Sequence, residues 1–550
     1  MVFKAIKNLF RSDAARQRAE QLATQVAVQR QPINATAEAY RWARRDRRTE
    51  AFQPQAATGD MQIAESHDLM HRRIRAQVLN TAQIKRIVQA LADLVVGCGV
   101  QTFSWPFAPW EATRILKELK AAKAGNLNPR LRFALEADDL FETWWHDEKQ
   151  IDVEGKRTGP ELQRDLLREC VQVGNGFLMR VVKRQPGTLI PLCYQLIERD
   201  QLDTTLDRPA EGGQNKIVNG VEVDPANRIV AYHFMDAHPY DSYASTYDLS
   251  HSTRVPADRV IDLCLFHRPS ASIGASWLDA VAQTSFDRDS FLDAELKSAV
   301  KGALLALIHK TKTPHLSGLL GMLDDDDDSE DEYGNEEVKL GNSPLAIQCG
   351  LDESVEMVES QRPNNQAQNF FKLLDRDTAA GAGVSVYTLT GDYESTNYSS
   401  VRAAKLDEDL HVRPLQQWFG AQVALPIRRE FNRLAAAAGL YETLRPAQFK
   451  ADERTYQRFD SIGPGRDLLD PFKETEAAKG KLGAGLTTLK IECARRGLHW
   501  IRVLLQQAIE RGVAEMLEVK LDWATQEQAM AEDGQQPDEK KREATSAAKS

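Results

Sequence analysis

Apolar side chains recur every three or four positions from His67 to Val96, and this spacing predicts one long amphipathic helix. Gly97 and Gly99 follow it and are expected to end it, since glycine is common just past helix C-termini. The same spacing indicates further helices near residues 111–124, 131–148, 160–173, 276–308 and 364–380. The chain is therefore predicted to be mainly helical.

Short runs of β-type residues interrupt this helical pattern and predict strands. These runs cover residues 177–182, 194–197, 218–223, 229–234 and 260–266. Turn residues such as Asp224-Pro225-Ala226-Asn227 separate them. Helices followed by such strands predict an α+β fold, and 550 residues are too many for one core, so several domains are expected.

The stretch from Leu373 to Asp409, named the signature segment here, combines several patterns. Small residues lead into a β-like run from Val384 to Leu389, and a polar turn follows at Gly391-Asp392-Tyr393. The string Asn397-Tyr398-Ser399-Ser400-Val401-Arg402-Ala403-Ala404 then opens a long helix. This helix is predicted to run toward Phe431, with kinks or breaks at Pro414 and Pro426.

The C-terminal part returns to short helical patterns. A loop is predicted over residues 461–470, and helices are predicted near 472–484, 487–496 and 499–517. The polar residues 526–550 contain few apolar side chains and predict a disordered tail.

Composition narrows the class of protein. The apolar content of 42% and charged content of 27% are typical of a globular protein. A net charge of −10 argues against a protein that grips nucleic acid over most of its surface. Six scattered cysteines without a C-x-x-C pair indicate core thiols in a reducing compartment. No apolar run approaches the roughly 18–20 residues that span a bilayer, so no membrane partner is expected.

Two charged segments stand out. Residues 1–60 are polar and hold the densest basic cluster, which consists of Arg41, Arg44, Arg45, Arg47 and Arg48. A solvated, partly ordered arm is the favoured interpretation of this cluster, and a contact to phosphate groups is the alternative. The acidic run at 324–337 places ten carboxylates in fourteen residues and predicts an exposed loop, because like charges repel. Its spacing does not match a calcium loop.

An enzyme of this length is expected to contain a recognisable catalytic motif. The sequence contains no G-x-x-x-x-G-K-[ST] phosphate loop and no G-x-S-x-G nucleophile motif. His67 and His71 have the i,i+4 spacing of zinc ligands, but Asp68 stands where a zinc protease has glutamate. We interpret them as a surface pair, and we expect no catalytic residue, metal or cofactor.

Several strings of this sequence resemble the lambda family of phage portal proteins. The signature segment is similar to the family's "tgD…NYSSxRaa" string. Three further blocks resemble family strings in the same order, and they are Arg72 to Gly99, Gln195 to Asp200 with Gly220 to His233, and Asp470 to Gly497. The chain departs from the family at Arg268 to Ser276, where an "RxGQxRG" string is expected. That departure puts in doubt the contact that this string makes in the family, but it does not put the fold in doubt.

The resemblance implies a multi-domain portal fold that assembles into a ring. It implies twelve copies at one capsid vertex, with DNA pumped through a central channel by a separate terminase. The implied divisions are an N-terminal arm at 1–60, a wing body at 61–272, stem–clip–stem at 273–380, tunnel segment and remaining wing at 381–465, a helical crown at 466–517 and a polar tail at 518–550. The implied location is the virion, with assembly in the host cytoplasm.

The resemblance also implies partners and channel residues. The partners are other copies of the chain, terminase, the major capsid protein and scaffold, head–tail adaptor proteins, and double-stranded DNA without sequence preference. The residues expected closest to the channel are Gly391, Asp392, Tyr393, Asn397, Arg402 and Lys405. Arg402 and Lys405 are candidate phosphate contacts, and ion pairs with Asp407, Glu408 or Asp409 are the alternative. A terminase subunit or nuclease is the competing function, although neither a phosphate loop nor a marked carboxylate cluster supports it.

Overall fold

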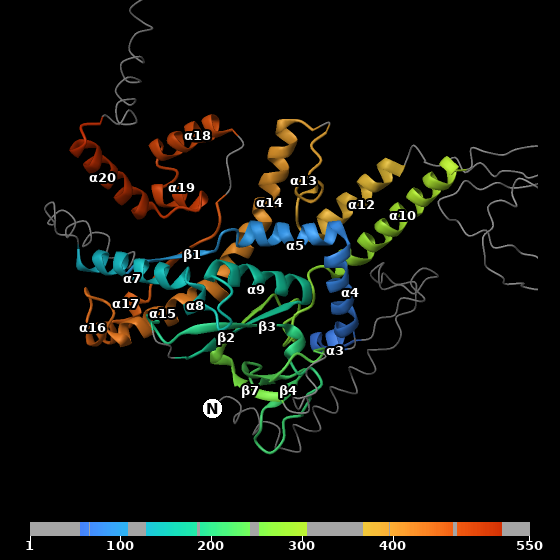
Figure 1. The fold of residues 1–550 in the computed structure, drawn as a ribbon, viewed down its shortest axis with the longest axis horizontal. Coiled ribbons are helices and arrows are strands. Elements are labelled where there is room, and N and C mark those ends of the chain that lie inside the picture. Colours follow the sequence, from blue (N-terminus) through green and yellow to red (C-terminus); the bar gives the residue numbers. More distant parts are fainter. Residues whose placement is uncertain are drawn as a thin grey trace, which may run out of the picture. The chain divides into compact units, whose positions relative to one another are not determined.

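A computed structural model of the chain describes residues 56–64, 66–107, 128–183, 187–241, 252–304, 367–394, 396–465 and 470–519 (Figure 1). The chain divides into two compact units, residues 1–58 and 59–550, and the described helices and strands belong to the second. The basic cluster at 41–48, the acidic run at 324–337 and the predicted helix near 111–124 lie outside the described residues.

The N-terminal part of the second unit contains three helices, α3 (Gly59–Ala64), α4 (His67–Asn80) and α5 (Ala82–Val95). The prediction of one continuous helix from 67 to 96 is wrong at Thr81, which has extended backbone angles between α4 and α5. A β-branched residue adopts such angles readily. The predicted stop is confirmed, because Gly97 and Gly99 have φ angles of +54° and +110°.

Three more helices complete the helical layer of the body. They are α7 (Pro129–Trp145), α8 (Glu148–Ile151) and α9 (Gly159–Val173). The side chain of Asn128 caps α7, and Thr158 and Glu161 form a capping box at the start of α9. The fully buried Trp144 packs on Phe431 and Tyr194, so α7 is joined to parts of the chain distant in sequence.

Two antiparallel sheets lie next to these helices (Figure 1). The first has the order β3-β2-β8, with β2 Asn175–Val181, β3 Cys193–Ile197 and β8 Val260–Cys264. The second is a meander of β4 Lys216–Val218, β5 Val221–Val223, β6 Ile229–Met235 and β7 Ser252–Pro256. The predicted single strand at 218–223 is in fact a hairpin, because Asn219 and Gly220 form a two-residue turn with positive φ at both positions.

A third, two-stranded sheet was not predicted. It pairs β1 (Gln101–Ser104) with β9 (Phe459–Ile462), and β9 falls partly in the segment expected to be a loop. Strands this short and this far apart leave little periodic signal in the sequence. The pairing fixes the C-terminal region against α7.

The long helix α10 (Asp279–Leu304) packs against α12 (Ala367–Ala382). Phe291 contacts Phe370 and Phe371, and the Arg288 Nε donates to Asp375 at 2.7 Å. After α12, the β-like run predicted at 384–389 is wrong, because a short helix, α13 (Val386–Thr390), stands there. Ser385 caps this helix through the Thr388 amide, and Gly391 ends it with a φ of +68°.

The helix predicted from Tyr398 toward Phe431 is present in two parts. α14 (Tyr398–Phe419) leads through a π-helical turn, η6 (Gly420–Ala424), into α15 (Leu425–Ala438). Pro414 lies inside α14, so the predicted break there is wrong. The wider turn lies where the Pro426 ring would meet the carbonyl of residue 422, which explains why the helix continues past that proline.

The helices predicted near 472–484, 487–496 and 499–517 are confirmed as α18 (Pro471–Gly483), α19 (Leu489–Arg495) and α20 (Trp500–Met516). Two short helices before them were not predicted, α16 (Pro446–Ala451) and α17 (Glu453–Tyr456). Short 3-10 turns cover Arg199–Gln201 (η3) and Ala257–Arg259 (η5). The described part of the chain is thus α+β and mainly helical. None of its helices is long and apolar enough to cross a membrane.

Candidate functional site

A buried ionic network joins two of the strings that resemble the portal family. Arg75 on α4 donates to Glu169 on α9 at 2.7 Å and to Asp200 at 2.5 Å. Arg199 is 2% exposed, and its guanidinium donates to the Asn175 Oδ1. This network holds α4, α9 and β2 together, so these motif residues act in the scaffold.

Burial dominates the electrostatics of this network. It raises the pKa of Glu169 to about 7, although the neighbouring Arg75 opposes the shift. It also raises the pKa of Asp262 to about 6, against hydrogen bonds from Asn175 and Tyr232. Both carboxyl groups therefore bind protons more tightly in the folded chain than in the unfolded chain.

The substitution Glu169→Gln is expected to flatten the pH dependence of stability between about pH 5 and 7. The folded pKa lies above the unfolded value, so the contribution of Glu169 is favourable at low pH and is lost as the pH rises through this window. Removing one such titration lowers the slope by up to about 1.4 kcal/mol per pH unit. The measurement is urea unfolding at several pH values.

The control is Glu161→Gln, because hydrogen bonds from Thr158 lower the pKa of Glu161 and move its titration below this window. A slope that is equally steep in the unsubstituted chain and in the Glu169→Gln variant would contradict the assignment.

His67 and His71 are poorly suited to hold a metal ion together. His67 and His71 lie with ring centroids 5.7 Å apart, but His71 is buried, so the surface-pair interpretation is wrong for it. Burial and the charge of Arg199 lower the pKa of His71 to about 2. A cationic neighbourhood of this kind disfavours a metal cation as well as a proton.

One group among the described residues has suitable metal-ligand chemistry, namely Glu198, Asp200 and His238. The Arg75 guanidinium already lies 2.5 Å from Asp200 and 3.7 Å from Glu198. A cation would have to displace this positive charge from both carboxylates. The arrangement therefore favours a structural ion pair over a metal centre.

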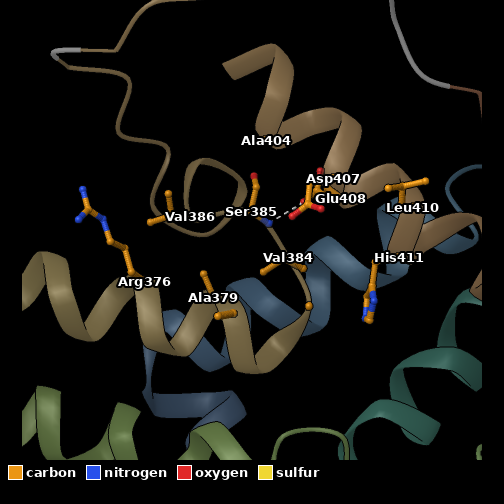
Figure 2. A pocket seen from close by; sticks show the side chains of 12 residues that line it. Arg376, Ala379, Val384, Ser385, Val386, Ala404, Asp407, Glu408, Leu410 and His411 are labelled. Atoms are coloured by element: carbon orange, nitrogen blue, oxygen red, sulfur yellow. Dashed lines mark hydrogen bonds between the residues drawn. The ribbon is translucent and has the colours of Figure 1, made fainter. Parts of the chain in front are cut away.

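The signature segment forms the second notable region, a pocket of about 570 Å³ between α12, α13 and α14 (Figure 2). The Ser385 amide donates to the Glu408 carboxylate at 3.0 Å, which ties the start of α13 to the middle of α14. The His411 ring lies where a Cβ on Gly383 would stand, so a larger residue at 383 would displace it. The pocket thus depends on close packing of the small residues in the segment.

The predicted channel residues lie together on the loop after α13 and on the first turns of α14. Gly391, Asp392, Tyr393 and Asn397 lie on this loop, and all four are exposed. Tyr393 stacks on Tyr387 at 5.8 Å with an interplanar angle of 11°, and the Asn397 side chain accepts from the Ser400 amide at 2.8 Å. The loop is therefore held by stacking at one end and by a helix cap at the other.

The two predicted cations lie on α14. Arg402 is exposed, and its charge adds to the Lys473 hydrogen bonds that lower the pKa of Asp470. Lys405 is half-buried. Of the acids proposed as their alternative partners, Glu408 accepts from Ser385, and Asp409 lies 3.5 Å from Arg413.

Sequence reasoning missed two anchors of the fold, one of which fixes the signature segment. The Arg86 Nε on α5 donates to the Thr388 carbonyl at 3.0 Å and fixes α13 from a helix 302 residues away in sequence. Arg428 forms a fully buried ion pair with Asp138 at 2.6 Å. Both depend on tertiary contacts, and an arginine in a helical pattern gives no sign that it is buried.

These features define a helical α+β scaffold with an exposed aromatic loop and ionic groups that serve its internal packing. Residues 45–416 match the model of the family described as "Phage portal protein, lambda family", and the chain therefore belongs to that family. Membership gives the chain the function of a phage portal protein, with the role of that family in genome packaging.

Individual relatives agree with this assignment. The "Probable portal protein" of Halomonas phage phiHAP-1 is 25% identical over 458 residues, which cover 82% of this chain and 81% of the relative. "Portal protein B" of Escherichia phage lambda is 22% identical over 377 residues, which cover 66% of this chain and 70% of the relative.

The solved structures to which the chain is similar include chains of gene transfer agent (GTA) particles. "Neck of empty GTA particle computed with C6 symmetry" gives a TM-score of 0.36 at 14% identity and covers 82% of this chain and 97% of that chain. "Neck of native GTA particle computed with C12 symmetry" gives 0.31 at 16% identity and covers 69% of this chain and 92% of that chain.

Proposed function

We propose that twelve copies of this chain close into a ring at one vertex of the capsid and that DNA enters and leaves through the ring. The match to the portal family over residues 45–416 is the observation that carries this proposal. The divisions are those that the family resemblance implies, with the wing at 61–272, stem–clip–stem at 273–380, tunnel segment and remaining wing at 381–465 and crown at 466–517. Terminase and head–tail adaptor proteins dock near the clip, and the major capsid protein and scaffold surround the ring.

The ring acts as a passive conduit. A lining rich in cations would release many counterions, bind the duplex tightly and stall its movement. A subunit with a net charge of −10 whose channel lining carries few, spaced cations lets the duplex slide. The exposed loop from Gly391 to Asn397 and the start of α14 are the part of the signature segment that we place nearest the DNA.

Negative-stain images of the purified full-length chain test this proposal. Rings with a central opening are expected, together with no ATP hydrolysis and no cleavage of DNA by the protein alone. A monomer that hydrolyses nucleotide or DNA by itself would favour the competing function as a terminase subunit or nuclease.

The substitution Arg402→Ala is expected to weaken the salt dependence of DNA binding by the assembled ring. Each phosphate contact contributes about 0.9 to the slope of log K against log salt concentration, so the slope should become shallower when this cation is removed. Lys405→Ala is expected to act in the same direction. The measurements are binding at several salt concentrations and the rate of DNA packaging in vitro.

Arg413→Ala is the matched control, because Arg413 lies on the same helix and is exposed beside Asp409. Unchanged packaging and salt dependence in both test variants would remove Arg402 and Lys405 from the proposed DNA contact and leave ring formation untouched.

A further inference from the structure

The C-terminal helices expose an unusual amount of apolar surface. Of the 28 large apolar side chains that are exposed in the described part of the chain, twelve lie between residues 470 and 519. They are Phe472, Leu482, Leu486, Leu489, Ile491, Leu498, Leu504, Ile509, Val513, Met516, Leu517 and Val519. Such a concentration is typical of an interaction surface, whereas apolar residues scattered singly need no explanation.

Side chains at the beginning of helix α20 anchor it to the body. Trp500 packs on Trp105 with ring centroids 5.7 Å apart, and Arg502 contacts Glu142 at 2.5 Å and lies over the Phe103 ring. From Ala508 to Val519 the only buried side chain is that of Ala514. A helix segment of this length is marginal in water by itself, so its last three turns need a partner.

Exposed apolar side chains in the second half of α20 form one stripe. Ile509, Val513 and Met516 follow the i, i+4, i+7 spacing that places side chains on one face, and the half-buried Leu505 lies on the same face. Ile509 is 59% exposed and Met516 is 78% exposed. A stripe of this kind fits another apolar helical surface.

The C-terminal region is nearly neutral, so electrostatic repulsion does not oppose contact with a second copy of the chain. Residues 470–519 contain eight Lys and Arg against seven Asp and Glu, although the whole chain carries −10. A nearly neutral surface neither repels its own copy nor selects a strongly charged partner. Apolar contacts of this type are most frequent in permanent homo-oligomers.

We infer that the α20 stripe of one subunit packs against apolar side chains of α18, α19 and the loop between them in the next subunit of the ring. A closed ring requires two different complementary surfaces on each subunit, and this region offers two. One is the stripe on α20, and the other is the set of Phe472, Leu486 and Ile491, which are 74%, 80% and 47% exposed. Within one chain α20 contacts α19 (Figure 1), and Ile509 and Met516 of the stripe stay exposed despite this contact. This inference rests on the proposed ring.

Lysine substitutions in full-length protein test this interface. Ile509→Lys and Val513→Lys bury a charge if the stripe is covered by a second copy, so the fraction of rings in mass photometry should fall at least tenfold. Leu486→Lys, in the loop between α18 and α19, alters the proposed partner surface and should have the same effect. Glu515→Lys introduces the same residue on another face of α20 and should leave ring formation unchanged.

The outcomes separate this inference from the proposed function. If the unmodified chain forms no rings, the proposed function fails. If it forms rings and Ile509→Lys forms them equally well, the inference alone is wrong. Loss of rings in Ile509→Lys but not in Leu486→Lys would refute the assigned partner surface. If a chain ending at residue 519 loses rings as Ile509→Lys does, the segment 520–550 covers the stripe and the inference is wrong. Circular dichroism of each variant checks that α20 and the body remain folded.

Discussion

Replacing Arg428 with methionine is expected to lower the free energy of unfolding by about 3–5 kcal/mol. Arg428 on α15 is fully buried and donates to Asp138 on α7 at 2.6 Å and to the Ser104 hydroxyl at 2.8 Å. Its guanidinium also lies 4.3 Å from the centre of the Phe141 ring. The substitution would leave the carboxylate of Asp138 buried without its main counter-charge.

The loss should come mainly from the abandoned carboxylate. Burial raises the pKa of Asp138, whereas the charge of Arg428 lowers it. Without the arginine, the cost of burying the carboxylate is opposed only by the weaker effects of Ser104 and Arg502. Asp138 also accepts from the Ser104 amide at 2.9 Å in β1, which means that the pair supports the β1–β9 sheet. Local opening of that sheet should accompany the loss of stability.

Urea unfolding followed by tryptophan fluorescence measures the effect, and hydrogen exchange of β1 and β9 locates it. The double variant Arg428→Met, Asp138→Leu is the control, because replacing both members of a buried ion pair with apolar residues is often nearly neutral. If the single variant loses less than about 1 kcal/mol, or if the double variant is no more stable than the single variant, the pair does not have this role.

Local patterns in the sequence predicted most of the helices and the central strands. Their apolar spacing is regular, as in α9 with its capping box at Thr158 and Glu161, and the structure contains them within a few residues. Predictions failed where a single residue determined the outcome. Val384 to Leu389 has strand-like composition, yet the Ser385 cap and the positive φ of Gly391 turn part of it into a helix.

The candidate site was predictable only in part, because most of its contacts join segments that are far apart in the sequence. Asn397 precedes a helical pattern, and a cap at that position follows from its short amide side chain. The stacking of Tyr393 on Tyr387, the Arg86 contact to α13 and the Glu408 contact to Ser385 depend on how separate segments meet. A single sequence contains no periodic signal for contacts of this kind.

The substitution Gly174→Ala is expected to destabilise the fold by about 4 kcal/mol or more. Gly174 ends α9 with a φ of +88°, a conformation that costs an alanine roughly 1–2 kcal/mol. In addition, a Cβ at 174 would lie 2.5 Å from the carbonyl carbon of Gly274 and 2.7 Å from that of Ala275. These are backbone atoms, so the clash cannot be relieved by rotating a side chain.

The backbone that Gly174 meets belongs to the segment 268–276, where this chain departs from the family string. Contacts hold that segment on several sides, since the Gly274 amide donates to Asn175 at 2.7 Å and the Ser272 amide donates to Asp60 at 2.6 Å. A Cβ on Gly274 would in turn lie 2.7 Å from the Cys264 sulfur. Movement of the loop away from residue 174 would therefore break polar contacts to β2 and α3.

Gly155→Ala provides a matched control for this last prediction. Gly155 has a φ of +66°, but a Cβ there would meet nothing within 4 Å, so only the backbone strain of roughly 1–2 kcal/mol should appear. The difference between the two variants in urea unfolding isolates the cost of the close approach between α9 and the 268–276 loop. Equal losses in both variants would mean that the loop yields easily. The departure from the family string would then have no structural consequence at this contact.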